Sequence, residues 1–486
     1  MATPYPDRDK IIGPGKVFKI ALPLVISSGI YASRIFCDRM MLAWRSETSI
    51  AATLSAGMAA FMLVSFFIGV VNYANAFVAQ YFGAGRPDRV GLAVWQAILF
   101  GLAMGPAIAL FGRLLSPIFR IVGHQENLAG EEEAYFLILT AGAFASLVTS
   151  GLMCFWTGRG KTWTVAGVGL LGVILNLTLN WALIFGAAGC DRFVGSPWPL
   201  AGIGGGLNAL AAWLGYDPMG IMGAGLATIA SDLAILMAFL ILFLRGGNRR
   251  EFGTWPRSAF DPGLSGRLFR FGFGNGMQML LDVGSFAVFT LLMSGYGDQP
   301  GGGNVGAASG IALSIHALAF IPMIGLGITV STLVGRGIGA GDIPLAVQSV
   351  RSSRVILLYY LGFIGVFLVL APELPASLFF SSATLNPATL SLTLYFIRLA
   401  GLSLTSDCFF VLYSHAIRGA GDTRFSMLVM GFCGWFLFAL PCLASYLLGA
   451  EPGFLWLILL FYSAVAAGIF YWRYRGGKWK GMRVIE

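Results

Sequence analysis

Long apolar runs separated by short polar connections dominate the sequence, and each run is long enough to cross a membrane as a helix. A bilayer core of about 30 Å requires about 20 apolar residues at 1.5 Å per residue. The pattern therefore predicts an all-α polytopic membrane protein with twelve transmembrane helices. They lie near residues 17–44, 50–79, 92–112, 134–157, 163–187, 220–245, 268–293, 305–334, 353–372, 388–416, 426–449 and 453–473.

Composition agrees with this interpretation, since 57% of the residues are hydrophobic and only 11% are charged. Such a balance excludes a string of soluble domains. Most of the 31 Lys and Arg residues fall in the two termini and in every second connection. Because basic residues are retained on the cytoplasmic side, we expect both termini in the cytoplasm and the protein in the cell inner membrane. The net charge of +9 is then a signal of topology, and we expect no nucleic-acid partner.

Two sequence motifs occur once in each half of the chain. VAQYFGAGRPD at 78–88 recurs as VGRGIGAGDIP at 334–344, and TGRGKT at 157–162 recurs as RGAGDT at 418–423. Each motif follows the equivalent predicted helix of its half. This spacing predicts two six-helix lobes related by a parallel internal repeat.

The longest strongly charged connection lies at the midpoint of the twelve predicted helices. We therefore expect an amino-terminal lobe at 1–244, a cytoplasmic linker at 245–267 and a carboxy-terminal lobe at 268–486. An internal duplication of this kind places a shared cavity between the lobes, and it permits alternating access when one lobe rocks against the other.

Asp38 lies inside the first apolar run. A carboxylate in such a segment faces a polar interior and by default marks an ion or substrate path. Arg34, one helical turn earlier, allows a second interpretation in which the two residues form a structural ion pair. The sequence leaves both interpretations open, and Arg39 places a further positive charge beside the carboxylate.

Polar residues form stripes on two other predicted helices. Asn275, Gln278 and Asp282 lie at positions that share one face of the seventh helix. Asn176 and Asn180 are one turn apart in the fifth, and their amide oxygens are ligands that a hard cation prefers. The alternative role for each stripe is hydrogen bonding between helices.

The tenth predicted helix carries Ser403 and Asp407 one turn apart, with His415 two turns further on. Asp282 and Asp407 have no basic residue one turn away, unlike Asp38. Buried carboxylates without a partner suit proton uptake and release, whereas polar neighbours suit Na⁺. Asp282 and Asp407 are therefore the candidate Na⁺ ligands.

Motifs for an enzyme or an ATP-driven pump are missing from the sequence. RGKT at 159–162 lacks the glycine of a phosphate-binding loop, because Phe155 occupies that position. The three histidines, His124, His316 and His415, share no metal-ligand spacing. We therefore expect no enzyme and no cofactor other than a coupling ion, H⁺ or Na⁺.

Several motifs together resemble the multidrug and toxic compound extrusion (MATE) family, over nearly the whole chain. They are CDRMMLA, AQYFGAG, NLTLNWALIFG, IMGAGLAT, GMQMLLDV, GLGITVSTLVGRGIGAGD and RGAGDT. The resemblance, best with the NorM-like branch, implies two six-helix lobes in a V and export of organic cations in exchange for Na⁺ or H⁺.

The resemblance also implies roles for individual residues. Asp38 matches the acid of the amino-terminal lobe, with Asn176 and Asn180 beside it and Thr228 as the helix-six hydroxyl of that site. Asp282 and Asp407 match the acids of the carboxy-terminal lobe. The chain departs from the family at Ser403, where tyrosine is common, and at Arg34 and Arg39, where uncharged residues are usual.

The sequence thus predicts a secondary active antiporter that exports organic cations or drugs and works as a monomer among membrane lipids. The alternative is a flippase for a lipid or lipid-linked sugar of the same superfamily, because basic groups such as Arg34 and Arg39 would suit a phosphate in the cavity.

The predicted topology is testable at Cys190, which lies in the long connection at 188–219. In a protein with the other five cysteines replaced, a membrane-impermeant thiol reagent should label Cys190 from outside the cell. Labelling only from the cytoplasmic side would show that the orientation is inverted.

Overall fold

The computed structural model describes residues 13–45, 47–121, 126–186, 218–255, 259–297, 303–377 and 387–485. These residues form helices and connections without a β-strand. The amino-terminal half contains α1 (Pro14–Arg45), α2 (Glu47–Asn72), α3 (Ala74–Gly83), α4 (Pro87–Leu115), α5 (Ile118–Ile121), α6 (Glu126–Ala141), α7 (Ala143–Thr157), α8 (Thr162–Phe185) and α10 (Ile221–Leu244).

A short helix, α11 (Gly246–Phe252), follows the amino-terminal half. The carboxy-terminal half contains α12 (Pro262–Gly295), α13 (Val305–Gly339), α14 (Ile343–Leu370), α15 (Glu373–Ser377), α16 (Pro387–Ala420), α17 (Thr423–Gly431), the π-helical segment Phe432–Ala439, α18 (Leu440–Leu447), α19 (Pro452–Arg475) and the 3₁₀ segment Lys478–Gly481.

The predicted set of twelve transmembrane helices is confirmed within the described residues. Eleven helical segments are long and apolar enough to cross a membrane, and the pair α6 and α7 makes the twelfth. This pair is bent by 41° at Gly142, against which Ile229 of α10 packs. Several helices continue past their apolar runs, as α13 does to Gly339, because the backbone hydrogen-bond ladder does not end where the polar residues begin.

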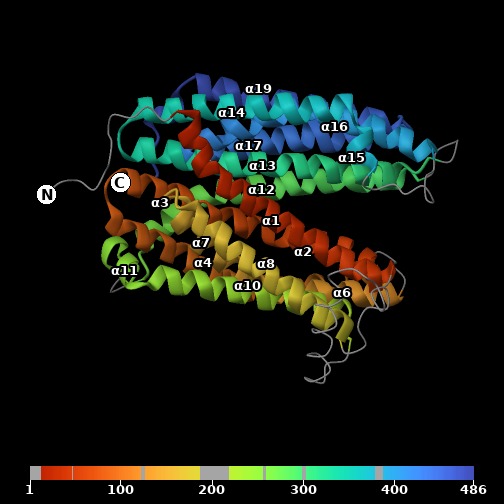
Figure 1. Cartoon of the computed structure of the whole chain (residues 1–486), viewed down its shortest axis with the longest axis horizontal. Coiled ribbons are helices and arrows are strands. Elements are labelled where there is room, and N and C mark those ends of the chain that lie inside the picture. The colour runs from red at the N-terminus through yellow and green to blue at the C-terminus, as the bar shows by residue number, and fades with distance from the viewer. Residues whose placement is uncertain are drawn as a thin grey trace.

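The helices form two layers, one from each half of the chain (Figure 1). The first turns of α1 and the carboxy-terminal segment lie toward the same end of the bundle, near α3 and α11, and we call this the terminal end. Helix α1 crosses from one layer to the other. Residues 187–217, which include Cys190, lie outside the described part of the chain.

Each half begins with a helix whose first turns belong to the core of the other half. Val17 and Ala21 of α1 are buried in the apolar cluster built by α13, α14, α16 and α19. Leu264 and Leu268 of α12 are buried in the cluster built by α3, α4, α7 and α10. The same exchange in both directions agrees with the internal repeat found in the sequence.

Glycines allow the two halves to touch through their backbones at the terminal end. A Cβ on Gly83 would overlap the carbonyl group of Arg336, and a Cβ on Gly339 would overlap that of Gln80. Gly83 and Gly339 are equivalent in the repeated motif, as are Gln80 and Arg336, so the contact is made twice with the halves exchanged. This is the contact that an approximate two-fold axis along the membrane normal generates.

Two helix crossings deeper in the bundle also place a glycine of one half against the backbone of the other half. Gly69 of α2 lies against the backbone of Asn275 and Gly276 in α12. Gly325 of α13 lies against the backbone of α1 at Val25. Helices α2 and α13 occupy equivalent places in the repeat, as do α1 and α12, so both crossings use a glycine in the second helix of one half.

The segment predicted as a linker, 245–267, contains helical structure. It holds α11 and the first turns of α12, with the side chain of Asp261 capping α12 by accepting a 3.0 Å hydrogen bond from the amide of Leu264. The guanidinium of Arg159 lies over the rings of Phe155 and Phe252, 3.5 and 4.2 Å from their centroids. Burial lowers the pKa of Arg159 to about 10. This stack fixes α11 to the end of α7.

Replacing Gly276 with alanine should destabilise the protein, because the added Cβ would overlap the carbonyl oxygen of Phe66 in α2. Overpacking of this kind costs about 1–3 kcal/mol, and the melting temperature of the purified protein should fall by a few degrees. Gly266→Ala in the same helix is the matched control, because a Cβ there meets nothing within 4 Å and alanine favours helix. Equal melting temperatures for the two variants would show that the crossing tolerates separation.

Candidate ion and substrate sites

Asp38 is part of a buried polar group in the amino-terminal half. The amide nitrogen of Asn180 donates hydrogen bonds to the Asp38 carboxylate and, at 3.2 Å, to the side-chain oxygen of Asn176. Asp38 is 8% exposed and both asparagines are fully buried. Asn176 Nδ2 and Asn180 Oδ1 have no hydrogen-bond partner among the described residues. The sequence prediction that α1 and α8 bring these three residues together agrees with this geometry.

One interpretation of the sequence was that Arg34 forms an ion pair with Asp38. The structure shows a different partner for Arg34. Its Nη1 lies 2.7 Å from Oδ1 of Asp232 in α10, and Ser146 of α7 donates a 2.7 Å hydrogen bond to the other oxygen of that carboxylate. The sequence analysis overlooked Asp232, although an acid inside the sixth apolar run is the same kind of signal as Asp38. The pairing balances the charge of Arg34, and among the described residues the Asp38 carboxylate accepts its hydrogen bond from the uncharged amide of Asn180.

Two other residues near this group lie apart from it. Thr228 of α10 is partly exposed, and the described hydrogen bonds do not join its side chain to Asp38 or the asparagines. Arg39 is exposed. Neither of the arginines that flank Asp38 in sequence therefore forms an ion pair with it in the described structure.

A second group surrounds Asp407 of α16. Nε2 of His316 in α13 lies 2.9 Å from one carboxylate oxygen, and Ser463 of α19 donates a 2.5 Å hydrogen bond to the other. Ser403, one turn before Asp407, lies 3.2 Å from the same histidine nitrogen. Three helices thus meet at Asp407.

Asp282 and Gln278 of α12 have buried oxygens without a hydrogen-bond partner among the described residues. The two residues lie one turn apart on the face that the sequence predicted. Asn275, the third member of that stripe, is engaged elsewhere. It donates a 2.6 Å hydrogen bond to the carbonyl of Gly69 and accepts a 3.0 Å hydrogen bond from Arg418, so it bridges the two halves of the chain.

No described contact joins Asp282 to Asp407, although the partly buried Tyr462 lies within electrostatic range of both. The described residues contain no group of three or more His, Cys, Asp or Glu side chains arranged around a metal ion. His415 bonds to the carbonyl of Val411 in its own helix and packs against Gly327. It therefore takes no part in the Asp407 group.

Sequence reasoning missed His316 and Ser463 because it tested histidines only for metal-ligand spacing. A histidine inside an apolar run is itself a signal of a polar interior, and it was available in the sequence. Ser463 gave no such signal, since serine is common at helix contacts in membranes.

Twelve spanning helices in two equivalent halves, with carboxylates buried inside the bundle, define a membrane transport protein. The MatE family model matches residues 23–182 and 276–442, one stretch in each half and more than half of the chain. The chain belongs to the MatE family. The family resemblance seen in the sequence is therefore confirmed.

Curated relatives match over most of their length. The multidrug resistance protein NorM of Vibrio parahaemolyticus is 25% identical over 436 residues, covering 89% of this chain and 87% of the relative. The multidrug resistance protein PmpM of Pseudomonas aeruginosa is 26% identical over 421 residues, covering 86% and 81%.

Solved structures support the fold. A transporter of the MOP superfamily from Pyrococcus furiosus has a TM-score of 0.80 at 17% identity, covering 97% of this chain and 98% of that one, and its structure is described as having a binding pocket of reverse polarity. Members of the MatE family are transporters driven by ion gradients, and they are not enzymes with bound cofactors. This confirms the two expectations from the sequence, that the protein is not an enzyme and that it uses no cofactor other than a coupling ion.

The pairing of Arg34 with Asp232 is testable by stability. Asp232→Asn leaves an unpaired arginine 6% exposed inside the bundle, and breaking a buried pair costs about 3–5 kcal/mol. The melting temperature should fall by several degrees, and adding Arg34→Gln should restore most of it. Asp38→Asn is the matched control and should change the melting temperature little, with no gain from Arg34→Gln. Rescue of Asp38→Asn alone by Arg34→Gln would assign the pair to Asp38 instead.

Proposed function

We propose that the protein is a secondary active antiporter that exports organic cations and drugs in exchange for H⁺ or Na⁺ by alternating access. Its relatives are named multidrug resistance proteins, which makes small organic compounds the substrate class. The observation that carries the proposal is that each half of the bundle holds a cluster of polar side chains around an acid, Asp38 in the amino-terminal half and Asp407 in the carboxy-terminal half.

The carboxy-terminal group supplies the coupling site. The free oxygens of Asp282 and Gln278 are the hard ligands that Na⁺ prefers. Asp407, in contact with His316 and Ser463, is the second carboxylate of this half. Asp282 and Asp407 are therefore the coupling residues, with Asn275 positioning the helix that carries Asp282.

The amino-terminal group supplies the site for the organic cation. Because Asp232 neutralises Arg34, Asp38 keeps its negative charge available to a cation. Asn176 Nδ2 and Asn180 Oδ1, which have no hydrogen-bond partner among the described residues, can orient that ligand, and Thr228 lies on the neighbouring α10.

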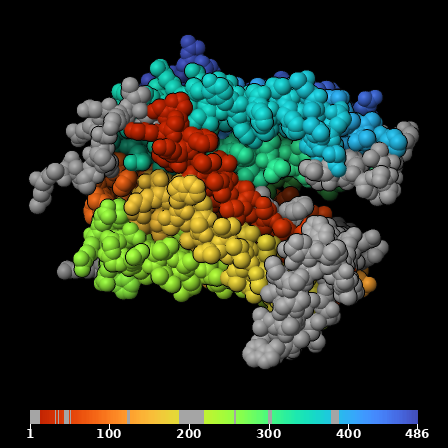
Figure 2. All heavy atoms as spheres, in the orientation of Figure 1, coloured from red at the N-terminus to blue at the C-terminus, as the bar shows by residue number. Residues whose placement is uncertain are grey.

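The two halves are joined at the terminal end. Gln80 of α3 donates hydrogen bonds of 3.1 and 3.3 Å to the carbonyls of Gly419 and Ala420, and its oxygen accepts a 2.9 Å hydrogen bond from the amide of Val484. Tyr73 donates to the carbonyl of Arg418 at 3.1 Å. At the opposite end an opening separates the halves in the space-filling view (Figure 2).

Alternating access requires these contacts to break when the opposite end closes. With both termini in the cytoplasm, the described state is closed to the cytoplasm and open outward. This orientation in an inner membrane, the division into lobes at 1–244 and 268–486, and a monomer surrounded by lipid form part of the proposal. A flippase is not favoured, because the curated relatives are drug-resistance proteins.

Transport in proteoliposomes with separately imposed Na⁺ and pH gradients tests the function. One monovalent cation moving inward gains about 2.3 kcal/mol per 100 mV, and a tenfold gradient costs about 1.4 kcal/mol. For a singly charged organic cation exchanged one for one, the potential cancels and only the ion's concentration gradient drives export. A fluorescent organic cation should therefore move uphill when the gradient of the coupling ion, Na⁺ or H⁺, is imposed. Movement that ignores both gradients would contradict antiport.

Asp282→Asn and Asp407→Asn should each reduce uphill export to the passive level, because a carboxylate that no longer changes charge cannot bind ion and substrate alternately. Asparagine keeps the size of the side chain, so the melting temperature should stay within a few degrees. Asp261→Asn, a matched loss of charge at the helix cap outside the bundle, should leave export unchanged. Export at the parental rate in both Asp282→Asn and Asp407→Asn would place the coupling site elsewhere.

A further inference from the structure

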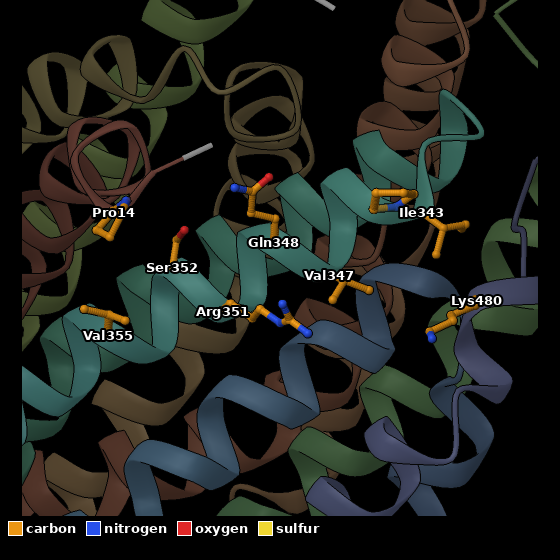
Figure 3. A pocket seen from close by; sticks show the side chains of 9 residues that line it. Pro14, Ile343, Val347, Gln348, Arg351, Ser352, Val355 and Lys480 are labelled. Carbon is orange, nitrogen blue, oxygen red and sulfur yellow. The ribbon is translucent and has the colours of Figure 1, made fainter. Parts of the chain in front are cut away.

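A groove of about 630 Å³ lies at the terminal end, where the start of α1, the first turns of α14 and the carboxy-terminal segment meet. Its size falls within the range of roughly 300–1,000 Å³ of small-molecule sites. Figure 3 shows Gln348 and Arg351 projecting from α14, with Pro14 of α1 on one side and Lys480 on the other. None of the sites described above includes these residues.

The groove is lined by both charged and apolar side chains. Arg351 and Lys480 are exposed and bring two positive charges to it, and Gln348 adds an amide group. Val347 and Val355 lie one helical turn before and one turn after Arg351 on the same face of α14. The groove therefore suits a ligand that carries a negative charge next to an apolar body.

The positive charges of the groove are not compensated by acids nearby. In the described parts of the three elements that form it, the ion pairs involve neither Arg351 nor Lys480. Asp342 and Asp422 are engaged in other contacts. Asp342 accepts the amide of Leu345 at 2.9 Å as the cap of α14, and Asp422 pairs with Arg473 at 2.7 Å. Lys16 and Lys19, both exposed on α1, add further positive charge.

The position of the groove along α14 matches the level of lipid head groups. Arg351 lies eight residues, or about 12 Å, from the start of the helix. The uninterrupted apolar run begins at Val355 and continues with Tyr359 and Phe363, which are 78% and 75% exposed. Because these exposed apolar residues face lipid, the groove opens at the boundary between the hydrocarbon and the polar layer.

We propose that this groove binds the head group of an anionic phospholipid, with Arg351 and Lys480 contacting the phosphate and the apolar face of α14 contacting the acyl chains. Basic pockets between membrane helices on the cytoplasmic side recognise phospholipid head groups by this chemistry. The site is independent of the transported substrate. It joins α1, whose first turns lie on the carboxy-terminal half, to the carboxy-terminal segment, whose Val484 contacts Gln80.

The test uses the full chain, purified in a neutral detergent, with phosphatidylglycerol as the probe. A ligand that binds only the folded protein raises its melting temperature by mass action. At about ten times its dissociation constant, phosphatidylglycerol should raise the melting temperature by a few degrees, whereas phosphatidylcholine should not. Inorganic phosphate and glycerol phosphate serve as controls, because they carry the phosphate without the acyl chains. They should raise the melting temperature less than the lipid does.

The double variant Arg351→Gln, Lys480→Gln should lose at least half of the shift produced by phosphatidylglycerol. The matched control is Arg475→Gln, Lys478→Gln, which removes the same charge from exposed positions outside the groove and should keep the shift. Native mass spectrometry should show one phosphatidylglycerol fewer on the first variant than on the second.

Three results would overturn the proposal. Equal loss of the shift in both double variants would show unspecific attraction of anionic lipid to a basic surface. A shift as large with inorganic phosphate would make the ligand a free anion. A shift that appears only after Asp7→Asn and Asp9→Asn would assign the groove to the acids of the chain's own amino-terminal segment.

Discussion

Close backbone contact at glycines is the constraint on which the arrangement of the two halves depends. In lipid there is little hydrophobic force between helices, so association depends on packing distance and on hydrogen bonds. Gly69, Gly83, Gly325 and Gly339 each bring a helix of one half against the main chain of the other. Because a Cβ at these positions would overlap the opposite main chain, the glycines set the distance and the register between the two halves.

The second constraint is electrical. An arginine inside a bundle is tolerated only with a partner, and α1 places Arg34 one turn from Asp38. The partner comes from another helix, as Asp232 of α10, and Ser146 completes the carboxylate's hydrogen bonding. This arrangement distinguishes the two acids, since Asp232 forms an ion pair with Arg34 whereas the Asp38 carboxylate accepts a hydrogen bond from the uncharged amide of Asn180.

The spans were predictable from sequence because bilayer thickness fixes the length of an apolar helix, and the repeat was predictable because glycine motifs recur where the halves touch. The grouping of Asp38 with Asn176 and Asn180 came from a family resemblance. The partners of Arg34 and Asp407 were not predictable, because Asp232, His316 and Ser463 come from helices whose rotation and neighbours are set by packing. The role of Asn275 was not predictable for the same reason. Its position in a polar stripe indicated an ion site, whereas its hydrogen bonds join the two halves.

Arg418 lies where the closed end and the carboxy-terminal acids meet. Its carbonyl accepts the hydroxyl of Tyr73 from the amino-terminal half, and its guanidinium donates to Asn275, which in turn donates to Gly69. The positive charge of the Arg418 guanidinium also interacts electrostatically with the carboxylate of Asp282. In the proposed mechanism, a cation or proton at Asp282 neutralises the carboxylate that interacts electrostatically with Arg418, and the carbonyl of Arg418 accepts a hydrogen bond that joins the halves at the terminal end. The proposed ion site and a contact that closes the halves therefore share a residue, which is the physical requirement for binding at one to bias the other.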